Sequence, residues 1–151
     1  MACRHIDEMM VAGVTENHAI RLLELFADVY AKLMNGGSAV PHSVSQVPLW
    51  SVAARRWRQS NPAAKPGIYL RVEHGTPRRG FARKVLELYR RRKLNKKTMD
   101  RLVNRYWKLA VITVDEDRRL KRSMLFETPE ARWQAAKIRF SKIQLTAKRP
   151  G

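Results

Sequence analysis

Positive charge is concentrated in the second part of this sequence, and this concentration limits how the chain can fold. Residues 1–64 hold six basic and five acidic side chains, whereas residues 65–151 hold 25 basic and eight acidic side chains. Such an excess of one sign repels itself and destabilises a compact state. We therefore expect the basic residues on exposed faces, and we expect a polyanion, nucleic acid first of all, as the partner.

The length and apolar content of the chain predict one compact domain. A chain of 151 residues that is 44% hydrophobic can bury a core of its own. No apolar run approaches the roughly 18 residues of a membrane span, and the N-terminal stretch MACRHIDEMM carries acids where a secretory signal would be apolar. We therefore predict a cytoplasmic protein with no membrane partner. The single Cys3 can form neither an internal disulfide nor a thiolate zinc cluster.

The near-neutral part, residues 1–64, has the apolar spacing of amphipathic helices. A short helix is predicted near residues 5–11, and a longer one from Thr15, a favoured N-cap, to the glycines that follow Asn35. Pro48 is predicted at the first position of a third helix. The apolar side of that helix would hold Leu49, Trp50, Val52, Ala53 and Trp57.

The strongly basic part, residues 65–151, contains two short patterns typical of strands. Ile68, Leu70 and Val72 alternate with polar residues, which is the period of a strand with one buried face. Residues 109–113, with the sequence LAVIT, form a β-branched apolar run that predicts a second strand.

Helical patterns lie between and after these strands. Residues 81–93 and 96–107 predict two helices inserted between the strands, a further helix is predicted from Val114, and Thr128 is predicted to cap a last helix that runs to about Ile138. The expected fold class is α+β, mostly α-helical: a short two-stranded finger with a helical insertion, preceded by an N-terminal helical part.

Glu73 and His74 stand where the first strand is predicted to end, and together with Asp117 they offer the groups that phosphodiester hydrolysis requires. A neutral imidazole near pH 7 can deprotonate a water nucleophile, and carboxylates can hold a hard cation that offsets phosphate charge. The carboxylates favour Mg²⁺ or Mn²⁺ over zinc. The alternative left open is that Glu73 and His74 are only polar residues at a strand end.

The segments VEHGTP, residues 72–77, and WKLAVITVDEDRRLKR, residues 107–122, resemble HNH or His-Me finger endonucleases. The resemblance implies a ββα metal finger in which His74 is the general base, Glu73 is a metal ligand and Asp117 completes the metal site. Two positions differ from the family pattern. Lys108 stands where an Asn is usual, and the late His or Asn is matched by Asp117 or, one turn later, by Lys121.

The acids at the start of the helix from Val114 are expected to have different roles. Asp117 lies about one turn into the helix, where its side chain can reach back toward the strand ends. Asp115 and Glu116 project to other sides and are expected only to complement the helix dipole, so that replacing Glu116 by Gln would cost a few tenths of a kcal/mol.

Runs of basic residues give the clearest indication of phosphate binding, although a charge run can also be a solvated face. These side chains read backbone charge and do not separate DNA from RNA; the nuclease hypothesis takes DNA as the substrate. The predicted nucleic-acid-binding residues are Arg78, Arg79, Arg91, Arg92, Lys96, Lys97, Arg118, Arg119 and Arg122.

The aromatic residues divide into two groups. Trp107 and Phe81 flank the basic helices and are candidates for stacking on exposed bases. Core packing is the better interpretation for the others, which fall on apolar faces: Trp50, Trp57, Tyr89, Tyr106 and Trp133.

Three hypotheses for the function follow from the sequence. The first is a metal-dependent HNH-like endonuclease, a hydrolase that cuts DNA. The second is a non-catalytic nucleic-acid-binding protein with a purely structural finger. The third is a basic adaptor or inhibitor that docks on an acidic protein surface. The oligomeric state is left open.

Overall fold

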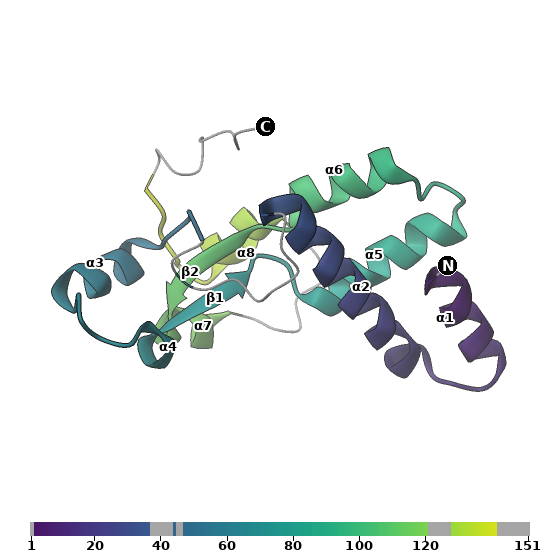
Figure 1. Cartoon of the computed structure of the whole chain (residues 1–151), viewed down its shortest axis with the longest axis horizontal. Helices are drawn as coiled ribbons and strands as arrows, with labels where there is room; N and C mark the ends of the chain where they lie inside the picture. The colour runs from purple at the N-terminus through teal and green to yellow at the C-terminus, as the bar shows by residue number, and fades with distance from the viewer. Residues whose placement is uncertain (1, 37–43, 45–46, 121–127, 142–151) are drawn as a thin grey trace. The chain divides into compact units, whose positions relative to one another are not determined.

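A computed structural model of the chain describes residues 2–36, 44, 47–120 and 128–141. It is mostly helical and contains one two-stranded antiparallel sheet, which confirms the predicted α+β class (Figure 1). Within the described ranges, no helix is both long enough and apolar enough to cross a membrane.

The chain divides into two compact units, each built from two separate segments. Residues Met1–Val40 and Thr76–Trp107 form one, here called the helical unit. Residues Pro41–Gly75 and Lys108–Gly151 form the other, here called the sheet unit. Each unit therefore combines residues from both the near-neutral and the strongly basic part of the sequence.

The described residues of the helical unit form four helices: α1 (Ala2–Val11), α2 (Glu16–Gly36), α5 (Arg78–Arg90) and α6 (Lys96–Tyr106). All four were predicted, with ends that differ by a few residues. Helix α6 begins at a capping box in which the side chains of Asn95 and Thr98 each accept the other's backbone N–H.

Phe81 and Trp107 lie in the core of the helical unit, which corrects the prediction that they stack on exposed bases. Phe81 is fully buried, Trp107 is 1% exposed, and their rings meet edge to face with centroids 4.9 Å apart. Phe81 projects from the apolar side of α5, and Trp107 is the C-cap residue of α6; packing of both side chains excludes a base.

The sheet unit contains α3 (Val52–Ser60), α4 (Pro66–Tyr69), β1 (Leu70–His74), β2 (Leu109–Thr113), α7 (Val114–Arg119) and α8 (Pro129–Ala135). β2 and the start of α7 lie where the sequence predicted them. The strands pair antiparallel, with Leu70 opposite Thr113 and His74 opposite Leu109. The order β1, β2, α7 is thus two antiparallel strands followed directly by a helix. The helices α5 and α6 are inserted between the two strands in sequence.

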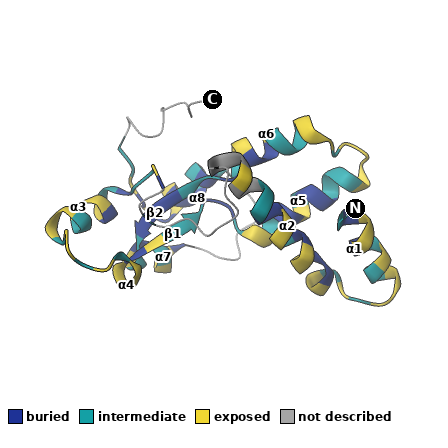
Figure 2. Ribbon diagram, in the orientation of Figure 1, coloured by how far each residue is buried: buried dark blue, intermediate teal, exposed yellow. Residues whose placement is uncertain are grey.

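The two faces of the sheet carry two separate apolar clusters, and the buried residues of β2 stand out in Figure 2. Leu70 and Val111 belong to one face, packed with Val47 and Ala54. The other face carries a cluster of Ala110, Ile112, Leu120, Trp133, Ala136 and Ile138. Trp133 is therefore a core residue, as predicted. Trp50, Trp57, Tyr89 and Tyr106 are partly buried.

Two predicted element boundaries are wrong, each because a local cap or turn competes with the apolar pattern. Pro48 does not begin a helix: Trp50 bridges Val111 of β2, and Ser51 caps α3, its side chain accepting the N–H of Ala54 at 3.0 Å. Ile68 is not in the strand, because Pro66 begins the short helix α4 and leaves Ile68 66% exposed.

Candidate active site

Glu73 and His74 are the last two residues of β1, as the sequence predicted. Successive residues of a strand project to opposite faces, so Glu73 shares a face with Ala110 and Ile112, and His74 shares the other with Leu70 and Val72. This arrangement does not suit two ligands of one ion. The carboxylate and the imidazole instead project to opposite faces of the sheet at the end of β1.

Arg132 of α8 binds the Glu73 carboxylate, a contact that the sequence did not predict. Its Nη1 donates to Glu73 Oε1 and also to the carbonyl oxygen of His74 at 3.2 Å. The side chains of Arg132 and Glu73 are only 9% and 15% exposed. Arg132 therefore holds both the acid and the backbone at the point where β1 ends.

Burial raises the pKa of the Glu73 carboxyl, and the Arg132 guanidinium opposes that shift. The charge of His74 also lowers the Glu73 pKa, whereas the charge of Asp117 raises it. Asp117, in the first turn of α7, has the smallest of these influences on the Glu73 pKa, and its pairing with Glu73 stays a prediction.

The backbone that follows His74 is held tightly between β2 and α8. The Gly75 N–H donates to the carbonyl oxygen of Lys108 at 2.7 Å and so extends the strand pairing by one bond. An added Cβ at Gly75 would lie 2.3 Å from Cβ of Pro129 and 2.9 Å from Cζ2 of Trp133. Only glycine leaves room for α8 to approach the strand end at this position.

Lys108, which stands where the resemblance expects Asn, is not directed to a reacting group. Its Nζ forms an ion pair with Glu130 of α8. Lys108 and Arg132 together thus fasten α8 to the ends of both strands.

Glu116 corrects the prediction that it merely complements the helix dipole. It is 4% exposed, and its Oε2 accepts the Thr113 N–H at 2.9 Å and the Ser51 hydroxyl at 2.6 Å. Asp115, in contrast, is exposed and pairs with Arg118 across one helical turn at 3.1 Å, as a surface acid should. The spacing Thr113-Val-Asp-Glu116 is a capping-box pattern, and this pattern was the signal for the role of Glu116.

The predicted nucleic-acid-binding residues are exposed in both units, with the exception of Arg122, which lies outside the described residues together with Lys121. Arg79, Arg91, Lys96 and Arg118 form surface ion pairs with nearby acids. Such pairs contribute little to stability, about 0 to 1 kcal/mol, so the cations can exchange them for phosphate. The side chains of Arg78, Arg92 and Lys97 have no polar partner within the described part of the chain.

Arg119 differs from the other predicted phosphate ligands. Its Nε donates to the carbonyl oxygen of Ala136 at 3.0 Å, at the C-terminal end of α8. A cation at that position satisfies an orphan carbonyl and complements the helix dipole. Arg119 therefore has a structural role in addition to any contact with a ligand.

Comparisons of this chain with protein-family models, with curated proteins and with solved structures find no match. Among the described residues, no group of three or more His, Cys, Asp or Glu side chains is placed to hold a metal ion. Any functional assignment therefore depends on the two carboxylates, the imidazole and the surrounding cations themselves.

Proposed function

We propose that this protein is a metal-dependent endonuclease of HNH type that hydrolyses phosphodiester bonds in DNA. The observation that carries the proposal is the placement of Glu73 and His74 as the last two residues of β1, with Asp117 in the first turn of the helix that directly follows β2. The order β1, β2, α7 is the order that the resemblance to His-Me finger endonucleases implies.

The two carboxylates suit a magnesium or manganese ion. Arg132 occupies Oε1 of Glu73, so Oε2 and the Asp117 carboxylate are the candidate ligands. Mg²⁺ is commonly held by one or two carboxylates and completes its shell with water and substrate phosphate. Such an ion would offset the charge that develops on the scissile phosphate and on the leaving oxygen.

His74 is the candidate general base of the reaction. A neutral imidazole there would take a proton from water as the water oxygen bonds to phosphorus and the bond to the leaving oxygen breaks. In-line displacement needs the base on the side of the attacking water and the cation on the side of the leaving oxygen. The opposite projection of His74 and Glu73 from the strand suits this division.

DNA cleavage in the presence and absence of a divalent cation tests the proposal. Supercoiled plasmid should be nicked or cut with Mg²⁺ or Mn²⁺ and remain intact with EDTA. Asp117→Asn should lower the cleavage rate and raise the cation concentration required for cleavage. The matched control is Asp115→Asn, because Asp115 is an exposed acid on the same helix turn. Equal losses in both variants would contradict a ligand role for Asp117.

A second candidate is a nucleic-acid-binding protein without catalytic activity. The Glu73–Arg132 ion pair favours it, because a carboxylate held by a buried arginine can serve structure alone. That function predicts binding that tolerates EDTA and no turnover with any cation, the reverse of the nuclease pattern.

A further inference from the structure

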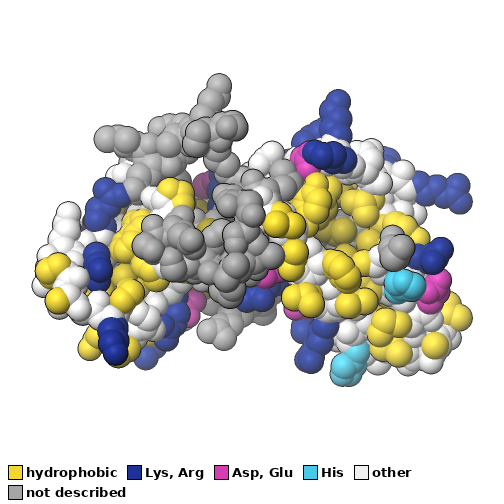
Figure 3. Space-filling view, viewed as in Figure 1, with side chains coloured by type: hydrophobic (Ala, Val, Ile, Leu, Met, Phe, Trp, Pro, Cys, Tyr) yellow, Lys and Arg dark blue, Asp and Glu magenta, His cyan; other side chains and the backbone are white. Residues whose placement is uncertain are grey.

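An apolar groove of about 800 Å³ lies on the helical unit, and none of its lining residues belongs to the proposed nuclease site, which is in the sheet unit. Helix α2 forms its bed, and α1, α5 and the start of α6 supply its walls. Figure 3 shows hydrophobic side chains gathered on this face of the molecule. The principal lining residues are Leu22, Leu23, Phe26, Tyr30, Val85 and Met99.

The bed of the groove has the geometry of a helix-packing surface. Leu22, Phe26 and Tyr30 follow one another at four-residue intervals along α2, which places them in a single ridge. Leu22 and Phe26 are 37% and 54% exposed, so this part of the ridge is open, whereas the Tyr30 hydroxyl at its end donates to Asp100 of α6 at 2.7 Å. Ridges of this spacing are the surfaces that fit between the side chains of another helix.

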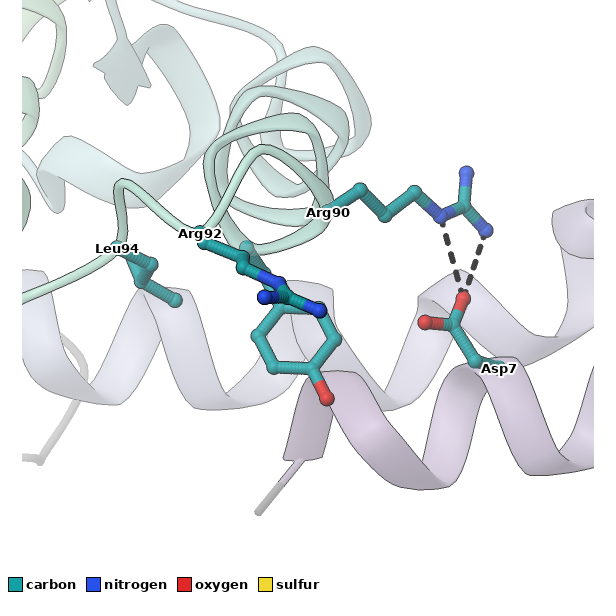
Figure 4. Close-up of a pocket in the computed structure, with 5 residues that line it drawn as sticks. Asp7, Arg90, Arg92 and Leu94 are labelled. Carbon is teal, nitrogen blue, oxygen red and sulfur yellow. Dashed lines mark hydrogen bonds and ion pairs between the residues drawn. The ribbon is translucent and has the colours of Figure 1, made fainter.

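A basic edge adjoins the groove where α5 leads into α6. A smaller pocket of about 460 Å³ shares Tyr89 and Leu94 with the groove and is also lined by Arg90 and Arg92. Figure 4 shows Arg90 directed to Asp7, whereas no interaction joins Arg92 to Asp7. Nη2 of Arg90 lies 2.9 Å from Oδ1 of Asp7.

The cations of this edge exceed the acids that face them. Arg92, Lys93 and Lys97 are exposed and have no ion partner among the described residues. Lys96 lines the groove itself, and its side chain is 84% exposed although it pairs with Asp100. The groove thus combines an apolar bed with a rim that attracts negative charge.

We propose that the groove binds an amphipathic helix of a partner protein, one that carries carboxylates beside its apolar stripe. The apolar ridge accepts the stripe, and Arg92 and Lys96 meet the carboxylates. The apolar lining of the groove does not fit a sugar-phosphate backbone, so the apolar part of this surface is not a DNA-binding site. Arg92 and Lys96, at the rim, are also predicted nucleic-acid-binding residues. The inference does not depend on nuclease activity.

Binding of two designed peptides to the full-length chain tests this proposal. Both are fluorescein-labelled helices of about 16 residues with leucines repeating every three or four positions; one carries Glu beside the stripe and the other carries Lys. Fluorescence anisotropy should show binding of the Glu peptide that weakens with salt, and at least about tenfold weaker binding of the Lys peptide.

Leu22→Glu and Leu25→Glu form a matched pair of variants on α2. Both leucines are exposed, but only Leu22 lines the groove, whereas Leu25 is 60% exposed outside it. Leu22→Glu should weaken binding of the Glu peptide at least about tenfold, and Leu25→Glu should leave it within about twofold. Circular dichroism of both variants checks that α2 remains helical.

Three results would overturn the proposal. The first is the absence of measurable binding by the Glu peptide, and the second is equal loss of binding in the two leucine variants. The third is a dimer of the wild-type chain in sedimentation equilibrium that Leu22→Glu dissociates, because a second copy would then be the occupant of the groove.

Discussion

The hydroxyl of Ser51 donates a hydrogen bond to Oε2 of Glu116 at 2.6 Å, so one buried carboxylate joins the N-termini of two helices. Ser51 is the N-cap of α3, and Glu116 closes the capping box that begins α7. Through this contact the helix that carries Asp117 is fixed to a segment about 65 residues earlier in the chain.

Removal of the Glu116 carboxylate should therefore destabilise the fold. Glu116→Ala leaves the Ser51 hydroxyl and the Thr113 N–H without their acceptor, and we expect a loss of about 2 to 3 kcal/mol in the free energy of unfolding. Urea denaturation provides the measurement. Asp115→Ala is the control and should change stability by less than about 0.5 kcal/mol, because Asp115 is exposed. A cost for Glu116→Ala no larger than this control would refute the buried capping role.

Gly75→Ala should destabilise the sheet unit by about 2 kcal/mol or more, because the new methyl group would overlap Pro129 and Trp133 of α8. Gly67→Ala is a matched control, since an added Cβ there meets no atom within 4 Å. It should leave stability unchanged or slightly higher. Thermal unfolding that shows similar shifts for both variants would be inconsistent with the close approach at Gly75.

Arg92 adopts a left-handed backbone conformation, with φ of 55°, at the end of α5. Its N–H bonds to the Tyr89 carbonyl oxygen and the next N–H bonds to that of Leu88, each at 2.8 Å, which is the Schellman pattern that usually has glycine at this position. Gly13, with φ of 88°, occupies the same position after α1.

Arg92→Gly should therefore raise stability and weaken DNA binding at the same time. We expect a gain of about 0.5 to 1 kcal/mol from relief of backbone strain, and a salt slope of binding lower by about 0.9 for one lost phosphate contact. Arg91→Gly is the control for the stability measurement. Arg91 has φ of −80°, so glycine relieves no backbone strain there and should not raise the free energy of unfolding. Unchanged DNA affinity in Arg92→Gly would place the phosphate contacts elsewhere, on residues such as Arg118.

Arg132→Gln should raise the pKa of Glu73 further, because it removes the largest influence that opposes the effect of burial. Carbon NMR titration of the Glu73 carboxyl measures this shift. The variant should lose about 3 kcal/mol of stability when the buried carboxylate is charged, and less at a lower pH that protonates it. Arg118→Gln, which breaks an exposed pair, should have little effect at any pH.

The wild-type protein should show the corresponding pH dependence. Because the native pKa of Glu73 is raised above its unfolded value, the native state binds more protons between those two pKa values. The contribution of Glu73 to stability is therefore greatest below the unfolded pKa and falls as the pH rises through the native pKa. Replacement of Glu73 by Gln should abolish this component of the pH profile.

Most elements could be predicted because local signals and tertiary packing agree. The β-branched run Leu109–Thr113 and the cap at Thr128 lie where the sequence predicted them. Ser51 and Pro66 were missed as helix starts, because the apolar spacing around each suggested a different element. Short-range caps decided both positions.

The polar contacts of the site were harder to predict. Glu73, His74 and Asp117 were predicted as site residues from residue type and position, and that role stays a prediction. Arg132 was not predicted, because a single arginine in a helix resembles a solvated surface residue. Its burial depends on contacts 58 and 59 residues away in sequence. A buried acid nevertheless requires a counter-charge, and that requirement was the available signal.

The most direct test of the proposed function compares His74→Ala with the wild-type chain in DNA cleavage and DNA binding under the same Mg²⁺ concentration. A general base supplies about 10²- to 10⁴-fold, so we predict a loss of cleavage of that size with DNA affinity nearly unchanged. Cleavage by His74→Ala at the wild-type rate, or no cation-dependent cleavage by the wild-type chain, would contradict the assignment of His74 as the catalytic base.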